Sequence, residues 1–291
     1  MRIVGSKPEV RAALARPRAE GRRIALVPTM GFLHAGHLAL LRAARADCDV
    51  VVMSLFVNPA QFGPGEDLDR YPRDERRDAA LAEAEGVDLV YAPPVEEVYP
   101  NNFTTQVVVE GPLTSVLCGD PERRGPEHFR GVTTVVAKLF NTVEPDVAYF
   151  GQKDGQQAAV IRRMTADLDF PVRIEVVPTV REGDGLALSS RNAYLGSEDR
   201  QRATALSRAL ARAAEGARHG SLEQGLEDAR AELRAAGIEP EYLEARDPDD
   251  LSSAATLNGR PVMIAVAARV GGARLIDNLI VQPDEDPKGK P

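Results

Sequence analysis

Residues 23–58, RIALVPTMGFLHAGHLALLRAARADCDVVVMSLFVN, contain two short apolar runs with a helical pattern between them. The runs at 23–29 and 49–58 are rich in aliphatic residues and predict strands, and the stretch at about 36–46 predicts a helix. A strand, a helix and a second strand in this order form a βαβ unit, which predicts a parallel sheet. The fold class expected from this stretch is therefore α/β.

The same alternation continues along the chain. We predict further strands at 87–92, 104–111, 146–151 and 172–179, and further helices at 73–86, 131–143 and 155–168. Because these strands carry apolar residues at successive positions, we expect helices to cover both faces of the sheet.

The pattern changes after about residue 182, where two charge-rich helical segments precede three strand-like runs joined by turns. The helices are predicted at 197–216 and 221–237, and the strands favour an antiparallel sheet. The sequence thus predicts a Rossmann-like, parallel-sheet N-terminal domain at 1–182, a smaller α+β lid domain at 183–282 and a disordered tail at 283–291.

The composition is typical of a soluble globular protein, with 43% hydrophobic residues, 27% charged residues and a net charge of −8. The acidic excess argues against a nucleic-acid partner bound over a broad surface. No apolar run reaches the roughly 18 residues that span a bilayer, and the N-terminus lacks the apolar core of a signal peptide. We therefore expect no membrane association and a cytoplasmic location, with Cys48 and Cys118 as free thiols.

Two histidines, His34 and His37, follow the first predicted strand and alternate with Gly31 and Gly36. Ligands of open α/β sheets bind beyond the carboxyl ends of the strands, and a helix that begins near Gly36 offers its N-terminus to an anion. Imidazoles three residues apart can share a helix face and donate to that anion. A capping or core histidine is the alternative. Zinc is less favoured because no further ligands lie nearby, and the stretch is neither a dinucleotide fingerprint nor a P-loop.

Two later stretches also place polar residues after strands. Lys153 and Asp154 follow the run at 146–151, where a lysine can neutralise phosphate and an aspartate can accept from ribose hydroxyls. The stretch SSRN at 189–192 offers hydroxyls and a guanidinium to a polyphosphate. Taken alone, Lys153 and Asp154 could be a solvated ion pair, and the stretch at 189–192 could be a simple turn before a helix. Their common place at one sheet edge favours a nucleotide site.

Five motifs together resemble the pantothenate synthetase (pantoate–β-alanine ligase) family of the nucleotidyltransferase superfamily. They are PTMGFLHAGH (28–37), FVNPAQF (56–62), HFRGVTTVVAKLFN (128–141), FGQKDGQQ (150–157) and REGDGLALSSRN (181–192), and the similarity runs from about residue 1 to residue 280. The resemblance implies a homodimeric enzyme that uses ATP and Mg²⁺. It would condense pantoate with β-alanine through a pantoyl adenylate and release AMP and pyrophosphate.

The resemblance also implies roles for particular residues. His37, as proton donor, would form the catalytic set with His34, Lys153 and Arg191. Gln61 and Gln157 would bind pantoate, Gln61 would also face β-alanine, and Asp78 would help to hold magnesium. The residues implied for ATP are Met30, Gly31, His34, Gly36, His37, Gly151, Gln152, Lys153, Asp154, Val180, Leu188, Ser189, Ser190 and Arg191.

The chain departs from the family pattern at several positions. Arg77 replaces an acidic residue often found beside Asp78, and Gln152, Gly155 and Leu188 replace residues that would shape the adenine pocket. Two other functions stay open. An adenylyltransferase that acts on a phosphorylated mononucleotide is disfavoured because Gln61 and Gln157 are uncharged. A nucleotide-binding regulatory protein is disfavoured because the histidines, the lysine and the arginine are all present.

Overall fold

The computed structural model describes residues 1–283, and the chain divides into two compact units. The first unit holds Met1–Gln152 and Val160–Val180, and the second holds Lys153–Ala159 and the chain from Arg181 onward. The domain boundaries predicted from the sequence stay a prediction. The predicted tail at 283–291 lies, apart from its first residue, outside the described residues.

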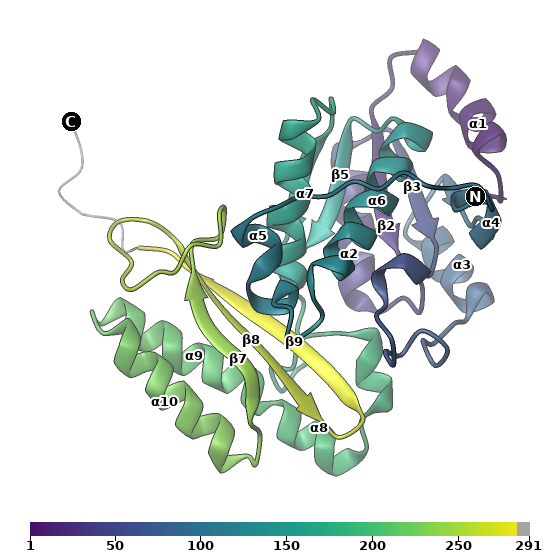
Figure 1. Ribbon diagram of the computed structural model, residues 1–291. Helices are drawn as coiled ribbons and strands as arrows, with labels where there is room; N and C mark the ends of the chain where they lie inside the picture. Colours follow the sequence, from purple (N-terminus) through teal and green to yellow (C-terminus); the bar gives the residue numbers. More distant parts are fainter. Residues whose placement is uncertain (284–291) are drawn as a thin grey trace. The chain divides into compact units, whose positions relative to one another are not determined.

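The first unit contains a six-stranded sheet in the order β1-β4-β3-β2-β5-β6, with parallel pairing throughout. Figure 1 labels β2, β3 and β5 of this sheet. Its strands are β1 (Arg2–Val4), β2 (Ile24–Thr29), β3 (Val50–Leu55), β4 (Leu89–Tyr91), β5 (Val147–Gly151) and β6 (Arg173–Val177). Its α-helices are α1 (Lys7–Ala19), α2 (Ala35–Asp47), α3 (Glu75–Ala84), α4 (Val95–Val98), α5 (Pro112–Ser115) and α6 (Pro126–Val143). Two 3₁₀ turns, η1 (Pro59–Gln61) and η2 (Leu117–Gly119), complete it, while η3 (Gln152–Asp154) and α7 (Gly155–Asp167) contain the points where the units divide. The predicted α/β class is confirmed.

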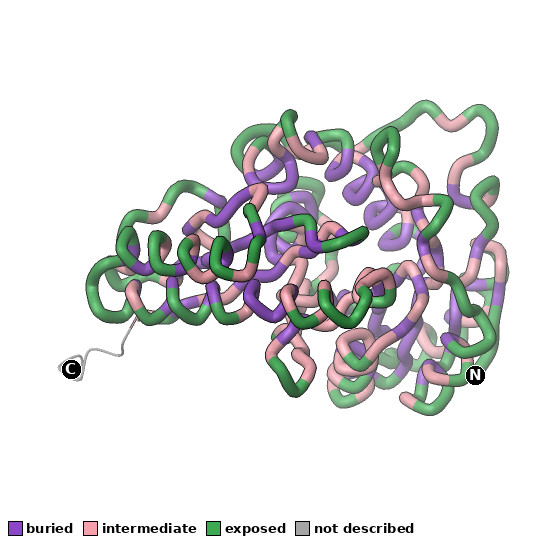
Figure 2. The backbone as a smooth tube through the Cα atoms, turned by 90° about the horizontal axis from the view of Figure 1, so that it is seen from below, coloured by how far each residue is buried: buried purple, intermediate pink, exposed green. Residues whose placement is uncertain are grey.

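Both faces of this sheet are covered, as the apolar runs predict. Successive residues of a strand point to opposite faces, so Ile24 and Leu26 pack in a core with residues of α1 and α6. Ala25 and Val27 instead pack in a second core with residues of α2. β2 and β3 are consequently buried along almost their whole length, whereas the edge strands β1 and β6 are partly exposed. Figure 2 colours the backbone by burial.

The strand order reverses between β2 and β5. From β2 the chain moves outward through β3 and β4, whereas β5 and β6 lie on the other side of β2. Such a reversal leaves a crevice at the carboxyl ends of the two central strands, where open α/β sheets bind their ligands. The segments that follow β2 and β5 are therefore the first places to look for a site.

The predicted strand at 104–111 is wrong, because these residues form no strand. The Val107 N–H donates to Thr134 Oγ1 at 3.0 Å, and the Val107 carbonyl accepts from Thr133 Oγ1 at 2.7 Å. Hydroxyls of α6 thus satisfy backbone groups that would otherwise need a neighbouring strand. The apolar pattern reflects the packing of Val107 and Val109 against the core of α1 and α6.

The structure also adds a strand and a helix, β1 and α1, that our prediction omitted. Helix α1 carries a recognisable start signal, since Ser6 stands three residues before Glu9. The Ser6 N–H donates to Glu9 Oε2 at 3.0 Å, as in a capping box.

The second unit contains a three-stranded antiparallel sheet in the order β7-β8-β9, which confirms the predicted α+β character. Its elements are η4 (Ser190–Tyr194), α8 (Ser197–Ala203), α9 (Ala205–Arg218), α10 (Leu222–Ala235), β7 (Pro240–Arg246), β8 (Val262–Val270) and β9 (Ala273–Val281). The single helix predicted at 197–216 is divided at Thr204 into α8 and α9.

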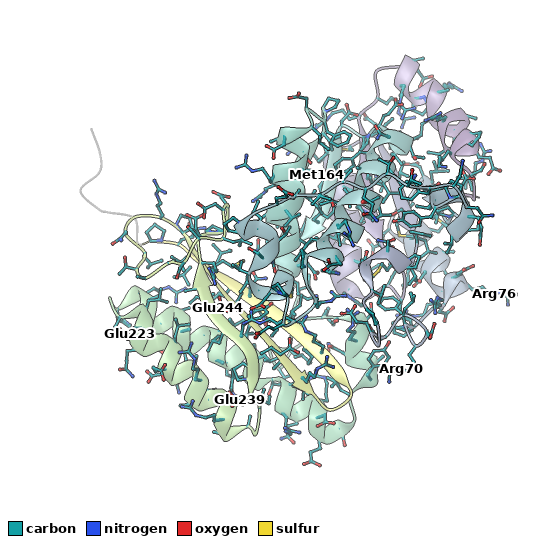
Figure 3. All side chains as sticks on the ribbon, in the orientation of Figure 1. Arg70, Arg76, Met164, Glu223, Glu239 and Glu244 are labelled. Carbon is teal, nitrogen blue, oxygen red and sulfur yellow. The ribbon has the colours of Figure 1, made fainter. Side chains whose placement is uncertain are left out.

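Helices α9 and α10 pack closely in the second unit. A Cβ on Gly216 would lie 2.5 Å from the Gly225 Cα, so neither position tolerates a side chain at this approach. Leu222 and Leu233 of α10 join the core with the sheet, while Glu223 lies on the exposed side (Figure 3). Within the part of the chain that the structure describes, no helix combines the length and the apolar composition required to cross a membrane.

Candidate active site

The turn between β2 and α2 adopts an unusual backbone conformation. Gly31 and Phe32 have φ values of 85° and 51°, in the left-handed region. Glycine is required at the first position for a second reason, because a Cβ there would lie 2.7 Å from Leu55 Cδ1 and 3.0 Å from Asp78 Oδ2. The turn therefore brings the backbone close to its neighbours and directs the chain into the start of α2.

His34 and His37 lie together at the N-terminus of α2. His34 is the N-cap, and its Nδ1 accepts from the Gly36 N–H at 3.2 Å. The His34 N–H in turn donates to His37 Nδ1 at 3.3 Å, and the ring centroids are 4.1 Å apart. The two rings form a capping box made of imidazoles, a role usually taken by Ser or Thr with Glu or Gln. The capping alternative and the functional interpretation are thus compatible.

This capping arrangement determines how the imidazoles can act. A ring nitrogen that accepts from a backbone N–H carries no proton, so the proton of each neutral ring is assigned to Nε2. Both histidines then have an Nε2–H donor, and both are half-buried. A pair of such donors beside a helix N-terminus is suited to an anionic oxygen.

Asp78 is buried, with 1% of its surface exposed, in the first turn of α3. Its Oδ2 accepts from the Phe32 N–H and its Oδ1 from the Leu33 N–H, both at 2.7 Å. Both carboxylate oxygens are therefore engaged with the strained turn that precedes His34. This arrangement gives Asp78 a positioning role, and its assignment as a magnesium ligand stays a prediction. Among the described residues, no three His, Cys, Asp or Glu side chains are grouped so that they could hold a metal ion.

We expect Asp78→Asn to destabilise the protein and to slow catalysis while leaving the magnesium requirement unchanged. The new amide would place an N–H donor against one of the two backbone donors, which costs about 1–3 kcal/mol in the free energy of unfolding. Urea unfolding and a magnesium titration of activity measure the two effects.

Asp74→Asn is the matched control for this variant. Asp74 is the exposed N-cap of the same helix and accepts from the Arg77 N–H at 3.1 Å, a role that Asn fills equally well. If Asp78→Asn had normal stability but needed more magnesium for activity, Asp78 would be a magnesium ligand.

Gln61 ends η1, directly after β3, and Asn58 fixes its orientation. The Asn58 Oδ1 accepts from the Ala60 N–H at 3.3 Å, and its Nδ2 donates to the Gly131 carbonyl at 3.1 Å. Because these backbone partners allow only one orientation of the Asn58 amide, its Nδ2 is also the donor to Gln61 Oε1, at 3.0 Å. Gln61 consequently presents its amide NH₂, rather than its oxygen, to a ligand.

The backbone around Gln61 is held by residues that come from α6 and the segment before it. His128 Nδ1 lies 2.8 Å from the Gln61 carbonyl oxygen, and Arg124 donates to the same oxygen at 3.2 Å. Gly131 of α6 packs so closely on η1 that a Cβ would overlap the Ala60 carbonyl. This explains why the motif HFRG belongs to the same constellation as FVNPAQF.

Glu66 neutralises Arg124 through a two-pronged contact, with N···O distances of 2.7 and 2.6 Å. Burial raises the pKa of Glu66, but the hydrogen bonds and charge of Arg124, together with the Gly63 N–H, outweigh burial and hold it below its ordinary value. Glu66 therefore stays a carboxylate at neutral pH, and Arg124 acts as a structural support of Gln61.

Asn58 and Tyr99 are site residues that our sequence reasoning missed. Asn58 is 2% exposed, and its Oδ1 also accepts from the Tyr99 hydroxyl at 2.8 Å. A signal was present for Asn58, since it is the N-cap of η1 directly before a proline in a quoted motif. No sequence pattern pointed to Tyr99, which is distant along the chain.

The end of β5 carries the next predicted residues. A Cβ on Gly151 would meet no atom within 4 Å, so packing does not require glycine there and the space suits a ligand. Gln152 and Lys153 begin η3, and Lys153 Nζ lies 3.2 Å from Asp154 Oδ2. Gln157 follows on α7, half-buried, beside the more deeply buried Gln156.

The remaining predicted residues follow β6. Val180 closes the first unit, and Leu188–Arg191 belong to the second. Ser189 is the N-cap of η4, and its Oγ accepts from the Arg191 N–H at 3.3 Å. Ser190 is buried at 7% exposure.

The neighbouring strands β3, β2, β5 and β6 are thus followed, in sheet order, by predicted site residues. Gln61 follows β3, Met30–His37 follow β2, Gly151 and Gln152 close β5 and begin the next turn, and Val180 follows β6. Within the sheet, the structure gathers them at one edge. An open parallel sheet with a glycine turn and two imidazole donors at its reversal point is typical of a nucleotide-binding α/β protein.

Comparison with known proteins identifies the family. A sequence model of the family described as "Pantoate-beta-alanine ligase" matches residues 2–280. The chain is 52% identical over 282 residues to pantothenate synthetase 1 of Bradyrhizobium diazoefficiens, covering 97% of this chain and 98% of that one. The chain belongs to the pantoate–β-alanine ligase family.

Solved structures agree with this placement. The pantothenate synthetase of Thermus thermophilus superposes with a TM-score of 0.91 at 51% identity, covering 97% of this chain and 100% of that one. The pantoate–β-alanine ligase of Francisella tularensis, described as complexed with βγ-ATP and β-alanine, gives a TM-score of 0.81 at 30% identity, covering 96% and 97%.

Proposed function

We propose that this protein catalyses the ATP-dependent condensation of pantoate with β-alanine, and so forms pantothenate for coenzyme A biosynthesis. The observation that carries the proposal is the position of the ligand-binding residues at neighbouring strand ends, with the imidazole pair after β2 and Gln61 after β3. Imidazole donors and a helix N-terminus suit the phosphates of ATP. An uncharged amide suits a hydroxy acid beside those phosphates.

The reaction proceeds in two steps. A carboxylate oxygen of pantoate attacks the α-phosphorus of ATP, the bond to the bridging oxygen breaks, and pyrophosphate leaves. The amine of β-alanine then attacks the acyl carbon of the adenylate, AMP leaves, and the amine loses a proton. Neither step requires a covalent bond to the enzyme.

We assign the phosphates to the imidazole pair. His34 and His37 donate from Nε2 to phosphate oxygens, and His37 is the principal donor to the charge that develops at the α-phosphate. Lys153 and Arg191 supply positive charge to the same nucleotide. The other proposed ATP contacts are Met30, Gly31, Gly36, Gly151, Gln152, Asp154, Val180, Leu188, Ser189 and Ser190.

Pantoate is assigned to Gln61 and Gln157, and β-alanine to the neighbourhood of Gln61. Magnesium is proposed to arrive bound to the phosphate oxygens of ATP, which usually supply much of its coordination. Asp78 is less suited to be a protein ligand of that ion, because each of its oxygens already accepts from a backbone N–H group. A homodimeric state and a cytoplasmic location remain part of the proposal.

We expect pyrophosphate release to require pantoate but not β-alanine, because adenylation precedes amide formation. In a rapid-quench experiment with ATP and magnesium, pantoate alone should give a burst of pyrophosphate equal to the enzyme concentration. Addition of β-alanine should then convert the burst into steady turnover.

A phosphorylated mononucleotide serves as the control substrate in this experiment. Pyrophosphate release with that compound, and none with pantoate, would favour the alternative adenylyltransferase. Absence of pyrophosphate until β-alanine is added would contradict the two-step scheme.

A further inference from the structure

Strand β9 of the second unit carries two buried polar residues in an otherwise apolar run, LIDNLIV (275–281). Asp277 is 3% exposed and Asn278 is 5% exposed, and they pair in register with Val266 and Ala265 of β8. An acidic side chain buried in a strand needs a partner, and burying it is costly. Asp277 and Asn278 lie outside the five motifs, so the resemblance implies no role for them. Their hydrogen-bond partners are therefore the evidence for what they do.

Asp277 anchors the hairpin that leads to the Ser189–Arg191 segment. Its two carboxylate oxygens accept from the Arg181 guanidinium at 2.6 and 3.0 Å, the fork geometry that fixes an arginine most firmly. Arg181 also donates to the Gly185 carbonyl at 3.1 Å and is bridged through its backbone to Ala187. The charge of Arg181 is therefore neutralised by Asp277, and its position determines that of the hairpin at 181–187.

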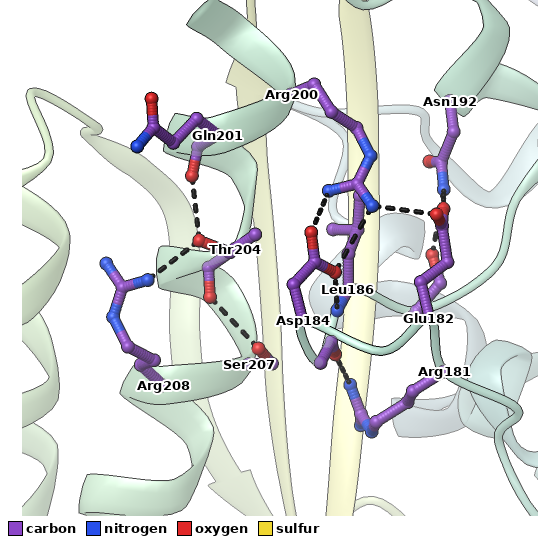
Figure 4. Close-up of polar contacts among 12 residues, drawn as sticks. Arg181, Glu182, Asp184, Leu186, Asn192, Arg200, Gln201, Thr204, Ser207 and Arg208 are labelled. Carbon is purple, nitrogen blue, oxygen red and sulfur yellow. Dashed lines mark hydrogen bonds and ion pairs between the residues drawn. The ribbon is translucent and has the colours of Figure 1, made fainter. Parts of the chain in front are cut away.

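The hairpin is joined to η4 by a second set of polar contacts (Figure 4). Arg200 of α8 donates to Glu182 Oε2 at 2.7 Å and lies 2.7 Å from Asp184 Oδ2. Asn192 of η4 donates to Glu182 Oε1 at 3.4 Å and to the Ala187 carbonyl at 3.1 Å. The hairpin and the Ser189–Arg191 segment are thus held as one piece.

Asn278 holds a different segment. Its Nδ2 donates to the backbone carbonyl of Lys153 at 2.9 Å. Because neighbouring residues of a strand point to opposite faces of the sheet, Asp277 and Asn278 can hold separate segments from one short stretch of β9. Lys153 and the Ser189–Arg191 segment are far apart along the chain, yet both depend on these two residues.

We propose that Asp277 and Asn278 are positioning residues that set the spacing between Lys153 and the Ser189–Arg191 segment, and through it the geometry of the ATP phosphate site. The inference rests on the proposed function, which assigns both segments to ATP. Neither residue touches substrate in this assignment. Their effect passes through the backbone of Lys153 and through the Arg181 hairpin.

Three variants test the proposal. Asp277→Asn keeps the size of the side chain and removes the charge that orients Arg181. Asn278→Ala leaves the pair of Asp277 and Arg181 intact and removes only the bond to Lys153. Glu241→Gln is the matched control, because it breaks another partly buried ion pair of the same sheet, with Arg274 Nε 2.8 Å from Glu241 Oε2.

The measurements are ATP affinity by calorimetry in the presence of magnesium without pantoate, hydrogen exchange, and thermal melting. We expect Asp277→Asn and Asn278→Ala each to weaken ATP binding about 10- to 100-fold, the range in which misplaced supporting groups act. Hydrogen exchange should rise in peptides covering 181–194 for Asp277→Asn and in peptides covering 150–158 for Asn278→Ala. Glu241→Gln should lower the melting temperature without either change.

The proposal would be overturned if Asp277→Asn and Asn278→Ala had the same ATP affinity and the same hydrogen exchange as Glu241→Gln. If Asp277→Asn fails to fold, Asn278→Ala alone decides it by the same two readouts. The wild-type enzyme separates this inference from the proposed function. Absence of pantoate-dependent pyrophosphate from the wild type would contradict the function, whereas normal release together with unaltered variants would contradict the positioning role.

Discussion

His37→Gln is expected to slow formation of the adenylate about 100-fold or more. Removal of one hydrogen-bond donor to the charge that develops in a transition state typically has an effect of this size. Glutamine is a natural residue at this position of a capping box, so its side-chain oxygen can still accept from the His34 N–H. The start of α2 should remain folded while the imidazole donor is lost. Single-turnover release of pyrophosphate measures the rate, and thermal melting measures the stability.

His37→Ala is the companion variant, since it removes both the donor and the cap. It should show the same loss of rate with an added loss of stability of about 0.5–1.5 kcal/mol, as expected for one missing hydrogen bond of the capping box. If His37→Gln turned over at the wild-type rate, His37 would be a capping residue only. A slow rate in His37→Ala alone would lead to the same conclusion.

Gln61→Glu is expected to produce the second large effect, on pantoate binding. Its carboxylate can still accept from Asn58 Nδ2, but it replaces the amide donor with a negative charge facing the carboxylate of the substrate. Loss of a donor to a buried polar group costs about 1–3 kcal/mol, or about 5- to 150-fold in affinity, and repulsion adds to this loss. Calorimetry should show weak pantoate binding and nearly normal ATP binding.

Gln61→Ala and Gln157→Ala complete this series. Each removes an amide without adding charge, so pantoate affinity should fall by about 5- to 150-fold. ATP affinity should stay close to that of the wild type. Weakened ATP binding with unchanged pantoate binding in these variants would show that the two substrates are assigned to the wrong residues.

Much of the fold was predictable because it depends on local patterns. The apolar runs at 23–29 and 49–58 correspond to β2 and β3, and the helix predicted between them corresponds to α2. Turns between the strand-like runs of the second half were also predicted, and at the turn from β8 to β9 Gly271 has the positive φ that glycine adopts readily. Each of these features is encoded by residues that are close together in the sequence.

The wrong strand has a clear physical cause, which is that a distant segment changed the local outcome. Residues 104–111 have the alternation of a strand, but the hydroxyls of Thr133 and Thr134 take their backbone groups. The division at Thr204 interrupts a continuous helical pattern, and the hydroxyl there donates to the Gln201 carbonyl at 2.7 Å and accepts from Arg208 at 2.7 Å. Local propensity is a weak guide wherever tertiary contacts compete with it.

The sequence by itself determined the α/β class and the order of the motifs, because the periodicity and types of neighbouring residues carry that information. The candidate nucleotide and pantoate residues were implied by the resemblance of those motifs to a known family, and they stay predictions. Only the tertiary structure decided how those residues are held. It placed the Asp78 carboxylate on the turn before His34, oriented Asn58 and through it Gln61, and revealed Asp277 and Asn278 as anchors. The bonds made by Asp78 and Asn278 join residues from 45 to 125 positions apart in the chain. Such bonds depend on the folded backbone, and no local pattern encodes them.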